Sequence, residues 1–309
     1  MASPAQQTTG GIDLARYHGW KGKLRNRWAG CFAMVRVCLL QVIRRKLYWL
    51  VLALGVSVFL IYWSLIYALA QLNLPEFSDA ILAEFQFNVN PTPGVESGFV
   101  QFMNQQSVVV MLLLALSGSQ LVGADFRLKT LTFYLSRRID RGQYIVGKLL
   151  AISTLIATMT VLPALLLFFE YGAFTTGREY WLANWQVIPA VLGYGAVMCF
   201  TLSLMLTTIS AYLQKMAPIA ITWACLFVLL KTIAVEVARE TREPSWLLLD
   251  LWADILFAGR VFFGVFPERE DGLIVGMNHG IAAWAILTIV CTVCMFLLVR
   301  RVRAVDVVE

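Results

Sequence analysis

The sequence predicts an all-α integral membrane protein with about six transmembrane helices. Hydrophobic residues make up 59% of the 309-residue chain and charged residues only 14%, whereas a soluble domain carries roughly 25% charged residues. The apolar residues are also gathered into uncharged runs. Each run approaches or exceeds the roughly 20 residues that cross a bilayer core of about 30 Å as a helix.

These uncharged runs give the positions of the spans. Because hydrocarbon offers no water to the backbone, each run is expected to form a helix. Pro163 and Pro218 lie within two of the runs and predict kinks or a broken turn. Lys231 is expected to extend its amino group outward from near the end of the fifth span. The predicted six-span domain covers residues 47–299, with spans at 47–70, 107–124, 149–169, 186–211, 216–235 and 280–299.

The segment before the first span has the pattern of an amphipathic helix. Over residues 24–46, Trp28 and Phe32 belong to an apolar stripe, whereas Arg25 and Arg36 fall elsewhere on the helical wheel. Such a helix is typical of a membrane interface. We therefore expect an interfacial elbow helix that leads into the first span.

Basic residues are distributed unequally between the two sides of the predicted bundle. One side comprises the N-terminal segment with its tail at 1–23, the loop 125–148, the turn 212–215 and the C-terminal tail at 300–309. It holds 19 of the 25 Lys and Arg residues but only 5 of the 19 Asp and Glu residues. Basic loops stay in the cytoplasm, so we expect a multi-pass bacterial inner-membrane protein with both termini cytoplasmic.

An apolar hairpin is predicted between the last two spans, on the outer side. Residues 245–266 are mostly apolar but include Asp250, Asp254 and Arg260. We interpret the segment as a helix that either lies in the outer interface or enters the membrane partway. The two aspartates are spaced to share a cation, but we favour their assignment to the solvated face of this helix.

Few residues point to chemistry within this chain. Residues 116–120 read LSGSQ, which is close to a motif of ATP-binding subunits, but no phosphate-binding loop accompanies it. We interpret these small residues as a site of close helix packing.

Cys291 and Cys294 lie within a span and are expected to be core residues, and His18 and His279 lie on opposite sides of the membrane. We predict no catalytic, cofactor-binding or metal-binding residue, contact of the basic N-terminal segment with anionic lipid, and no nucleic-acid partner.

The loop 125–148 differs from the others because it can form a short amphipathic helix. Two interpretations of such a helix are equally compatible with its geometry. It can seat in a groove of a soluble partner, or it can rest on lipid headgroups. The apolar stripe consists of Leu128, Leu131 and Leu135, with Tyr134 beside it and Arg127, Arg137 and Arg138 on polar sectors.

This loop resembles that of the permease subunits of type-2 ABC transporters. In that family the loop after the second span reads roughly D-x-x-x-G-T-L-x-x-L-L-S-R-P-x-S-R-x-x-Y-x-x-G-K. Among the departures of this chain from the pattern are Lys129, Arg138 and Asp140. The matching residues are Asp125, Thr130, Leu131, Leu135, Ser136, Arg137, Arg141, Tyr144, Gly147 and Lys148.

The resemblance implies that the loop is a coupling helix that docks in a cleft of a separate ABC ATPase subunit. ATP and Mg would be bound by that partner, and this chain would hold no cofactor and perform no catalysis. A second permease copy, identical or similar, would complete the translocation path of an exporter. The residues implied in coupling are Asp125, Leu128, Leu131, Tyr134, Leu135, Arg137 and Arg138.

Two other functional classes are weighed against the transporter. The first is a membrane scaffold of an ABC-type complex that acts in the maturation or assembly of another protein. The second is an intramembrane enzyme, which the sequence disfavours because the spans hold no cluster of acid, base, nucleophile or metal ligand. The richness of the spans in Leu, Val and aromatic residues mildly favours a lipidic or amphipathic substrate over an ion.

Overall fold

The computed structural model describes residues 28–71, 95–128, 140–174, 177–265, 269–270, 273–274 and 277–303. Within these residues, six helices are long and apolar enough to cross a membrane. The multi-pass helical membrane class is therefore confirmed. The candidate spans are Lys46–Ala68, Glu96–Arg127, Arg141–Phe174, Tyr180–Leu213, Met216–Thr241 and Gly280–Val302.

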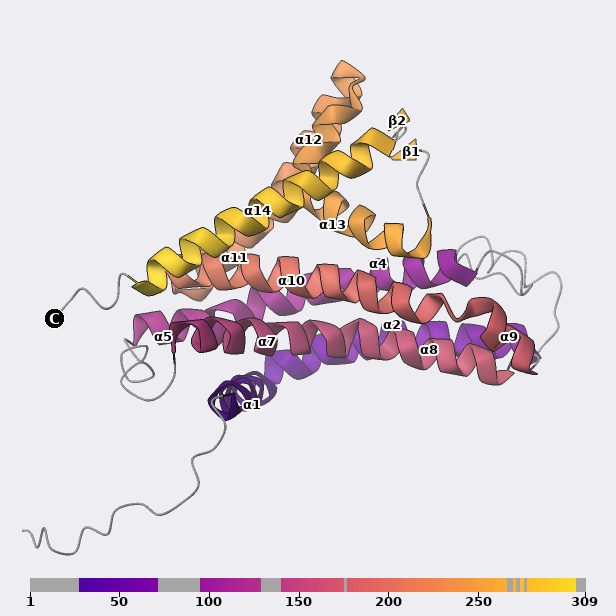
Figure 1. The fold of residues 1–309 in the computed structure, drawn as a ribbon, viewed down its shortest axis with the longest axis horizontal. Helices are drawn as coiled ribbons and strands as arrows, with labels where there is room; N and C mark the ends of the chain where they lie inside the picture. The colour runs from indigo at the N-terminus through magenta and orange to yellow at the C-terminus, as the bar shows by residue number, and fades with distance from the viewer. Residues whose placement is uncertain are drawn as a thin grey trace, which may run out of the picture.

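The helical elements follow the chain order shown in Figure 1. Several spans are built from two or three consecutive helical pieces. The first half of the chain contains α1 (Ala29–Ile43), α2 (Lys46–Gln71), α4 (Val95–Gly118), the π-turn η2 (Ser119–Gly123), α5 (Ala124–Arg127), α7 (Arg141–Met159) and α8 (Val161–Phe174). The second half contains α9 (Gly177–Asn184), α10 (Val187–Leu213), α11 (Met216–Ala224), the π-turn η3 (Cys225–Leu229), α12 (Leu230–Thr241), the 3₁₀ turn η4 (Pro244–Leu249), α13 (Leu251–Arg260), the 3₁₀ turn η5 (Val261–Phe263) and α14 (Met277–Arg303).

One small departure from the all-α expectation lies just before α14. Strands β1 (Arg269–Glu270) and β2 (Leu273–Ile274) pair antiparallel, with Arg269 opposite Ile274 and Glu270 opposite Leu273. In the part of the chain that the structure describes, these are the only strands. The hairpin closes the segment between the last two spans and leaves the helical bundle unchanged.

Most of the spans lie side by side in one bundle. Figure 1 shows α1 almost end-on beneath the bundle, so that this helix crosses the spans instead of running along them. At one end the chain places Arg45, Arg127, Arg141 and Arg300, and we call this the basic end. Toward the other end, α12 and α14 diverge from the remaining helices (Figure 1).

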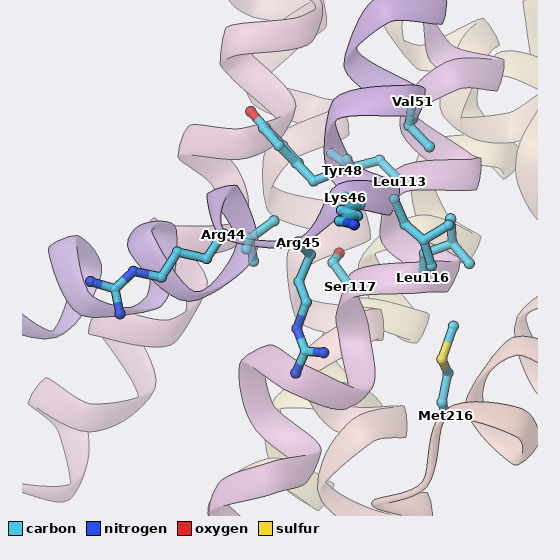
Figure 2. Close-up of a pocket in the computed structure, with 11 residues that line it drawn as sticks. Arg44, Arg45, Lys46, Tyr48, Val51, Leu113, Leu116, Ser117 and Met216 are labelled. Carbon is cyan, nitrogen blue, oxygen red and sulfur yellow. The ribbon is translucent and has the colours of Figure 1, made fainter.

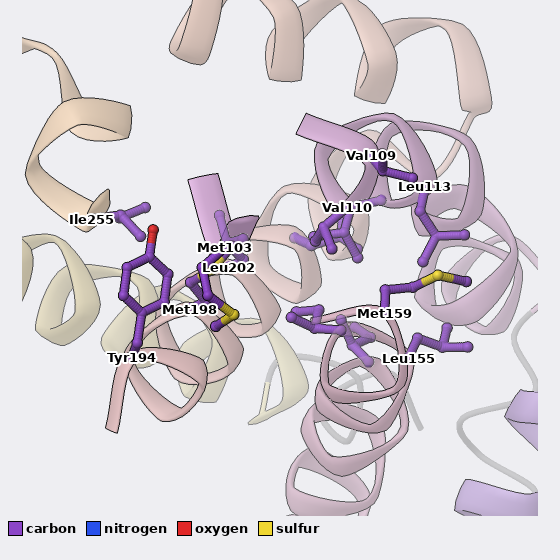
Figure 3. Close-up of a cluster of buried hydrophobic side chains, with 14 of the residues drawn as sticks. Met103, Val109, Val110, Leu113, Leu155, Met159, Tyr194, Met198, Leu202 and Ile255 are labelled. Atoms are coloured by element: carbon purple, nitrogen blue, oxygen red, sulfur yellow. The ribbon is translucent and has the colours of Figure 1, made fainter. Parts of the chain in front are cut away.

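The second and fourth spans form the centre of the bundle. In their most apolar windows 62% and 56% of the residues are buried, against 28% for the first span and 22% for the sixth. Figure 3 shows their side chains, among them Met103, Val110, Met198 and Leu202, packed with Leu155 from α7. The first and sixth spans therefore present most of their apolar surface outward, as expected for helices that face lipid or another subunit.

The two prolines within spans have different effects. The third span breaks at Thr160, between α7 and α8, and Pro163 lies three residues later. A proline cannot donate to the carbonyl four residues earlier and clashes with it, so the broken turn at Thr160 agrees with the prediction for Pro163. The kink predicted at Pro218 is wrong, because this residue lies in the first turn of α11, where backbone N–H groups have no acceptor within the helix.

The LSGSQ segment lies where the second and fourth spans approach closely. A Cβ atom added to Gly118 would lie 2.6 Å from Leu206 Cδ1, and one added to Gly123 would lie 2.8 Å from the carbonyl oxygen of Gln214. Only a residue without a side chain allows these approaches. The interpretation of the small residues as packing residues is confirmed.

The apolar hairpin between the last two spans is packed into the bundle. Helix α13 contacts α10 and α14, and the ring of Trp252 lies 6.0 Å from that of Phe227 in the fifth span. Asp250 and Asp254 are 2% and 1% exposed, so their assignment to a solvated face is wrong. Asp250 instead accepts hydrogen bonds from the backbone N–H groups of Trp252 and Ala253 and caps α13.

Candidate functional site

A buried ion pair joins the two ends of the loop at 125–148. Lys148 Nζ lies 2.7 Å from Asp125 Oδ2, and the two side chains are 3% and 13% exposed. The Tyr144 hydroxyl donates to the same carboxylate oxygen over 3.0 Å. Since Asp125 lies near the end of the second span and Lys148 lies in α7 of the third, this cluster, which we call the clasp, fixes one span to the other.

Lys148 also connects the clasp to two further elements. Its ammonium group donates to the carbonyl oxygen of Leu121 within the π-turn η2 and to Cys38 Sγ of α1 at 3.3 Å. A π-turn interrupts the regular hydrogen-bond ladder of a helix, and here it carries the carbonyl that accepts from Lys148. The lysine therefore has an anionic partner and two neutral acceptors, which is how a buried charge is tolerated.

The chain leaves the loop at a well-defined helix start. Asp140 lies at the N-cap position of α7 and forms a capping box with Gln143, whose Oε1 accepts from the Asp140 backbone N–H over 3.2 Å. Asp140 is one of the departures from the family pattern, which has serine there. Aspartate and serine are both favoured N-cap residues, so the departure preserves a capping residue.

The elbow helix α1 packs against α7 through a face adjacent to the predicted apolar stripe. Its buried residues are Cys31, Met34, Cys38 and Val42. Trp28 is 53% exposed, Phe32 is 68% exposed and Arg36 is exposed. The buried face is rotated by roughly 70° from the predicted apolar stripe, at 3.6 residues per turn. The reason is that α7 offers a close approach at Gly147, where an added Cβ atom would lie 3.0 Å from Met34 Sδ.

The structure places only part of the predicted site. Asp125 lies in the clasp, and Leu128 is 63% exposed just after α5. The remaining predicted residues, Arg25, Leu131, Tyr134, Leu135, Arg137 and Arg138, lie outside the described residues.

Sequence reasoning did not assign Tyr144, Lys148 or Cys38 to the site. The spacing of Tyr144 and Lys148 could have indicated that the two side chains lie together, because residues four apart share one face of a helix. The contact with Cys38 spans 110 positions in the sequence, and no local pattern indicates it.

A second polar feature lies along α12. Lys231, Glu236 and Arg239 are exposed, and Arg239 pairs with Glu236 at 3.4 Å. They line one wall of a cavity of about 550 Å³ between α4, α12 and α13, together with Val108, Met111, Leu112, Phe227, Val228, Thr232, Val235 and Trp252.

The helix that carries Lys231 extends beyond residue 235, the predicted end of the fifth span. It continues for ten residues after Lys231, to Thr241, a length of about 15 Å. In the part of the chain that the structure describes, Lys231 forms no ion pair or hydrogen bond. Helix α12, which carries Lys231, also holds Glu236, Arg239 and Glu240 and forms the polar end of this span.

A third charge, Glu170 in α8, is buried. Its residue is 4% exposed, and neither carboxylate oxygen has a hydrogen-bond partner among the residues that the structure describes. Within the described residues, no three His, Cys, Asp or Glu side chains are grouped to hold a metal ion, and all six cysteines are free thiols.

No protein-family model matches this chain, and no protein of curated function matches it.

Proposed function

We propose that this protein is the membrane-spanning permease subunit of an ABC transporter, an exporter driven by a separate ATPase that docks on the loop 125–148. One observation carries the proposal. Asp125, Tyr144 and Lys148 are three positions of the loop pattern, and they meet in one hydrogen-bonded ion pair. A loop whose two ends are tied together in this way is a suitable attachment point for a motor protein.

The clasp also supports the transmission of movement from the loop to the spans. A force applied to the loop reaches α5 through Asp125 and α7 through Lys148, and it reaches α1 through the contact of Lys148 with Cys38. Packed elements joined in this way move as bodies, which is the usual basis of switching between two states. The loop, the elbow helix and the halves of the second and third spans next to the loop would therefore tilt together.

The cavity along α12 supports a place for the translocation path. An exposed, unpaired lysine is unfavourable against lipid, so we assign the face of α4 and α12 that carries Lys231 to a water-filled path between two permease copies. The walls of this cavity combine charged and aromatic side chains, including Lys231 and Trp252. Such a lining suits an amphipathic substrate better than a bare ion.

The basic end is assigned to the cytoplasm in this proposal, because the loop must reach an ATPase. Fusing alkaline phosphatase, which is active only outside the cytoplasm, after residue 309 tests this orientation. We expect no phosphatase activity from that fusion. We expect high activity when the enzyme is inserted between Thr241 and Arg242, at the opposite end of the fifth span. The reverse pattern would exclude docking of a cytoplasmic ATPase on the loop.

Docking itself is tested by co-purification of the ATPase with variants of the loop. The double variant Leu131→Asp, Leu135→Asp places charge on the predicted apolar stripe and should lose the ATPase. A matched control, Leu182→Asp with Trp185→Asp, adds the same charge at the other end of the bundle, where these residues are 70% and 59% exposed. Retention of the ATPase by the loop variant would contradict the proposal. A complex that binds the ATPase but no solute would favour the scaffold alternative.

A further inference from the structure

Two adjacent cavities open at the basic end, where α1 turns into α2. The first has a volume of about 470 Å³, and Figure 2 shows the side chains around it. The second has a volume of about 630 Å³ and shares Arg44, Arg45 and Met216 with the first. The first is otherwise lined by Val42, Lys46, Leu47, Tyr48, Val51, Leu113, Leu116 and Ser117, and the second by Gln41, Ala124, Arg127 and Leu128.

Among the residues that the structure describes, the charged side chains around these cavities are all positive. They are Arg44, Arg45, Lys46 and Arg127. None of the four forms an ion pair or hydrogen bond through its side chain in the part of the chain that the structure describes. The nearby carboxylate of Asp125 is already held by Lys148. Four unneutralised cations in one place favour an anionic ligand.

The joined cavities have a polar half, which carries the cations, and an apolar half. In Figure 2 the Arg45 side chain extends from the α1–α2 turn past Ser117, whereas Arg44 points away from the group. The opposite wall consists of aliphatic side chains from α2 and α4, among them Val51 and Leu116. A ligand that fills both halves has an anionic head and a hydrocarbon tail.

We propose that the two cavities form a binding site for one anionic phospholipid. The phosphate group lies between Arg45 and Arg127, and the upper part of an acyl chain lies between α2 and α4. Arginine suits this role because its guanidinium group forms bidentate hydrogen bonds with phosphate. The site requires only that the chain spans a membrane, so it does not depend on the proposed ABC partner.

Such a lipid would touch three elements at their junction. The α1–α2 turn contributes Arg45, the end of the second span contributes Arg127, and the start of α11 contributes Met216. Bound lipid would thus hold the elbow helix against the second and fifth spans beside the clasp. The elbow helix would then contact one specifically bound lipid in addition to the headgroups of the surrounding membrane.

The site is tested by native mass spectrometry of the full chain in detergent, titrated with phosphatidylglycerol or with phosphatidylcholine of the same acyl chains. We expect retention of one phosphatidylglycerol molecule and much weaker retention of phosphatidylcholine. The variant Arg45→Gln, Arg127→Gln should weaken phosphatidylglycerol binding roughly 30-fold, at about fivefold for each cation near a headgroup. The control Arg36→Gln, Arg300→Gln removes two exposed charges of the same end that line neither cavity and should bind like the parent.

A further comparison separates a lipid from a free phosphate. Leu116→Trp fills the apolar half and should weaken lipid binding, and inorganic phosphate at millimolar concentration should compete poorly with the lipid. Equal binding of the two lipids, or equal losses in the cavity variant and its control, would overturn the proposal. Effective competition by inorganic phosphate, together with unchanged binding to Leu116→Trp, would show an anion site without a lipid tail and would also overturn it.

Discussion

Lys148 and Lys231 both lie within membrane-spanning helices, but their surroundings differ. Lys148 is 2% exposed and is held by Asp125, Leu121 and Cys38. Lys231 is exposed on α12 and has no partner among the described residues. The same side chain is thus buried with its charge compensated in one region and open with its charge uncompensated in the other.

This difference separates structural charges from charges available for function. Removing one member of a buried pair leaves the other charge unpaired in an apolar environment, which is strongly destabilising. An exposed charge contributes little to the folded state and persists in a span where water or a partner reaches it. We therefore expect the clasp to control stability and the α12 face to control activity.

The largest effect is expected when the clasp loses its lysine. Lys148→Met leaves the Asp125 carboxylate buried without a cation and should lower the free energy of unfolding by about 3–5 kcal/mol. Reversible unfolding in mixed micelles with increasing dodecyl sulfate measures this change. The double variant Lys148→Met, Asp125→Asn removes both charges and should recover most of the loss. Equal losses in the two variants would mean that the lysine acts through packing alone.

Glu170 is a buried acidic residue without a hydrogen-bond partner among the described residues. Its removal should therefore stabilise the protein, in contrast to the removal of Lys148. Because neither of its carboxylate oxygens is hydrogen-bonded, Glu170→Leu removes an uncompensated polar group and should raise the free energy of unfolding by about 1–3 kcal/mol. The same unfolding titration checks this. Destabilisation by Glu170→Leu would indicate that the carboxylate has a partner in the working protein.

Tyr144→Phe should change the free energy of unfolding by less than Lys148→Met or Glu170→Leu does. The change removes one hydrogen bond to a charged acceptor but leaves the ion pair, so we expect a loss of about 1.5 kcal/mol. Combining Tyr144→Phe with Lys148→Met in a double-mutant cycle measures the coupling between the two groups. A coupling energy near zero would show that the clasp is not a single network.

The smallest change in stability is expected for Lys231→Leu, within about 0.5 kcal/mol of the parent. In the complex with its ATPase, however, this variant should lose stimulation of ATP hydrolysis by substrate, because it removes a positive charge from the wall of the cavity. Val228→Leu, on the same exposed face, is the matched control and should retain stimulation. A loss of stability as large as that of Lys148→Met would remove the distinction between the two lysines.

Much of the fold was predictable because local composition decides it. The first and sixth spans match their helices closely, since no charged residue lies within residues 47–70 or 280–299. The second span was predicted too short, because Glu96 and the polar residues from Gln101 to Gln106 belong to its helix and are stabilised there by burial and tertiary contacts. Hydropathy alone does not predict that a polar residue belongs to a span when the hydrogen-bond partners of that residue come from other helices.

The candidate site was predictable only in part. The sequence indicated Asp125 and the loop, but the partners of Asp125 come from α7 and the contact with Cys38 comes from α1. The face of α1 that packs on α7 was not predicted, because the wheel of this helix carries apolar residues on two adjacent sectors. Only the position of Gly147 on α7 decides which sector is buried.

The amino-acid sequence by itself determined that the chain spans a membrane about six times, because transfer of a long uncharged run into hydrocarbon depends on composition alone. It also determined the break near Pro163, which follows from the covalent structure of proline. Only the tertiary structure decided which charges are paired, which face of the elbow helix is buried and where cations gather around a cavity. These properties depend on distances between side chains far apart in the sequence, and no local pattern encodes such distances.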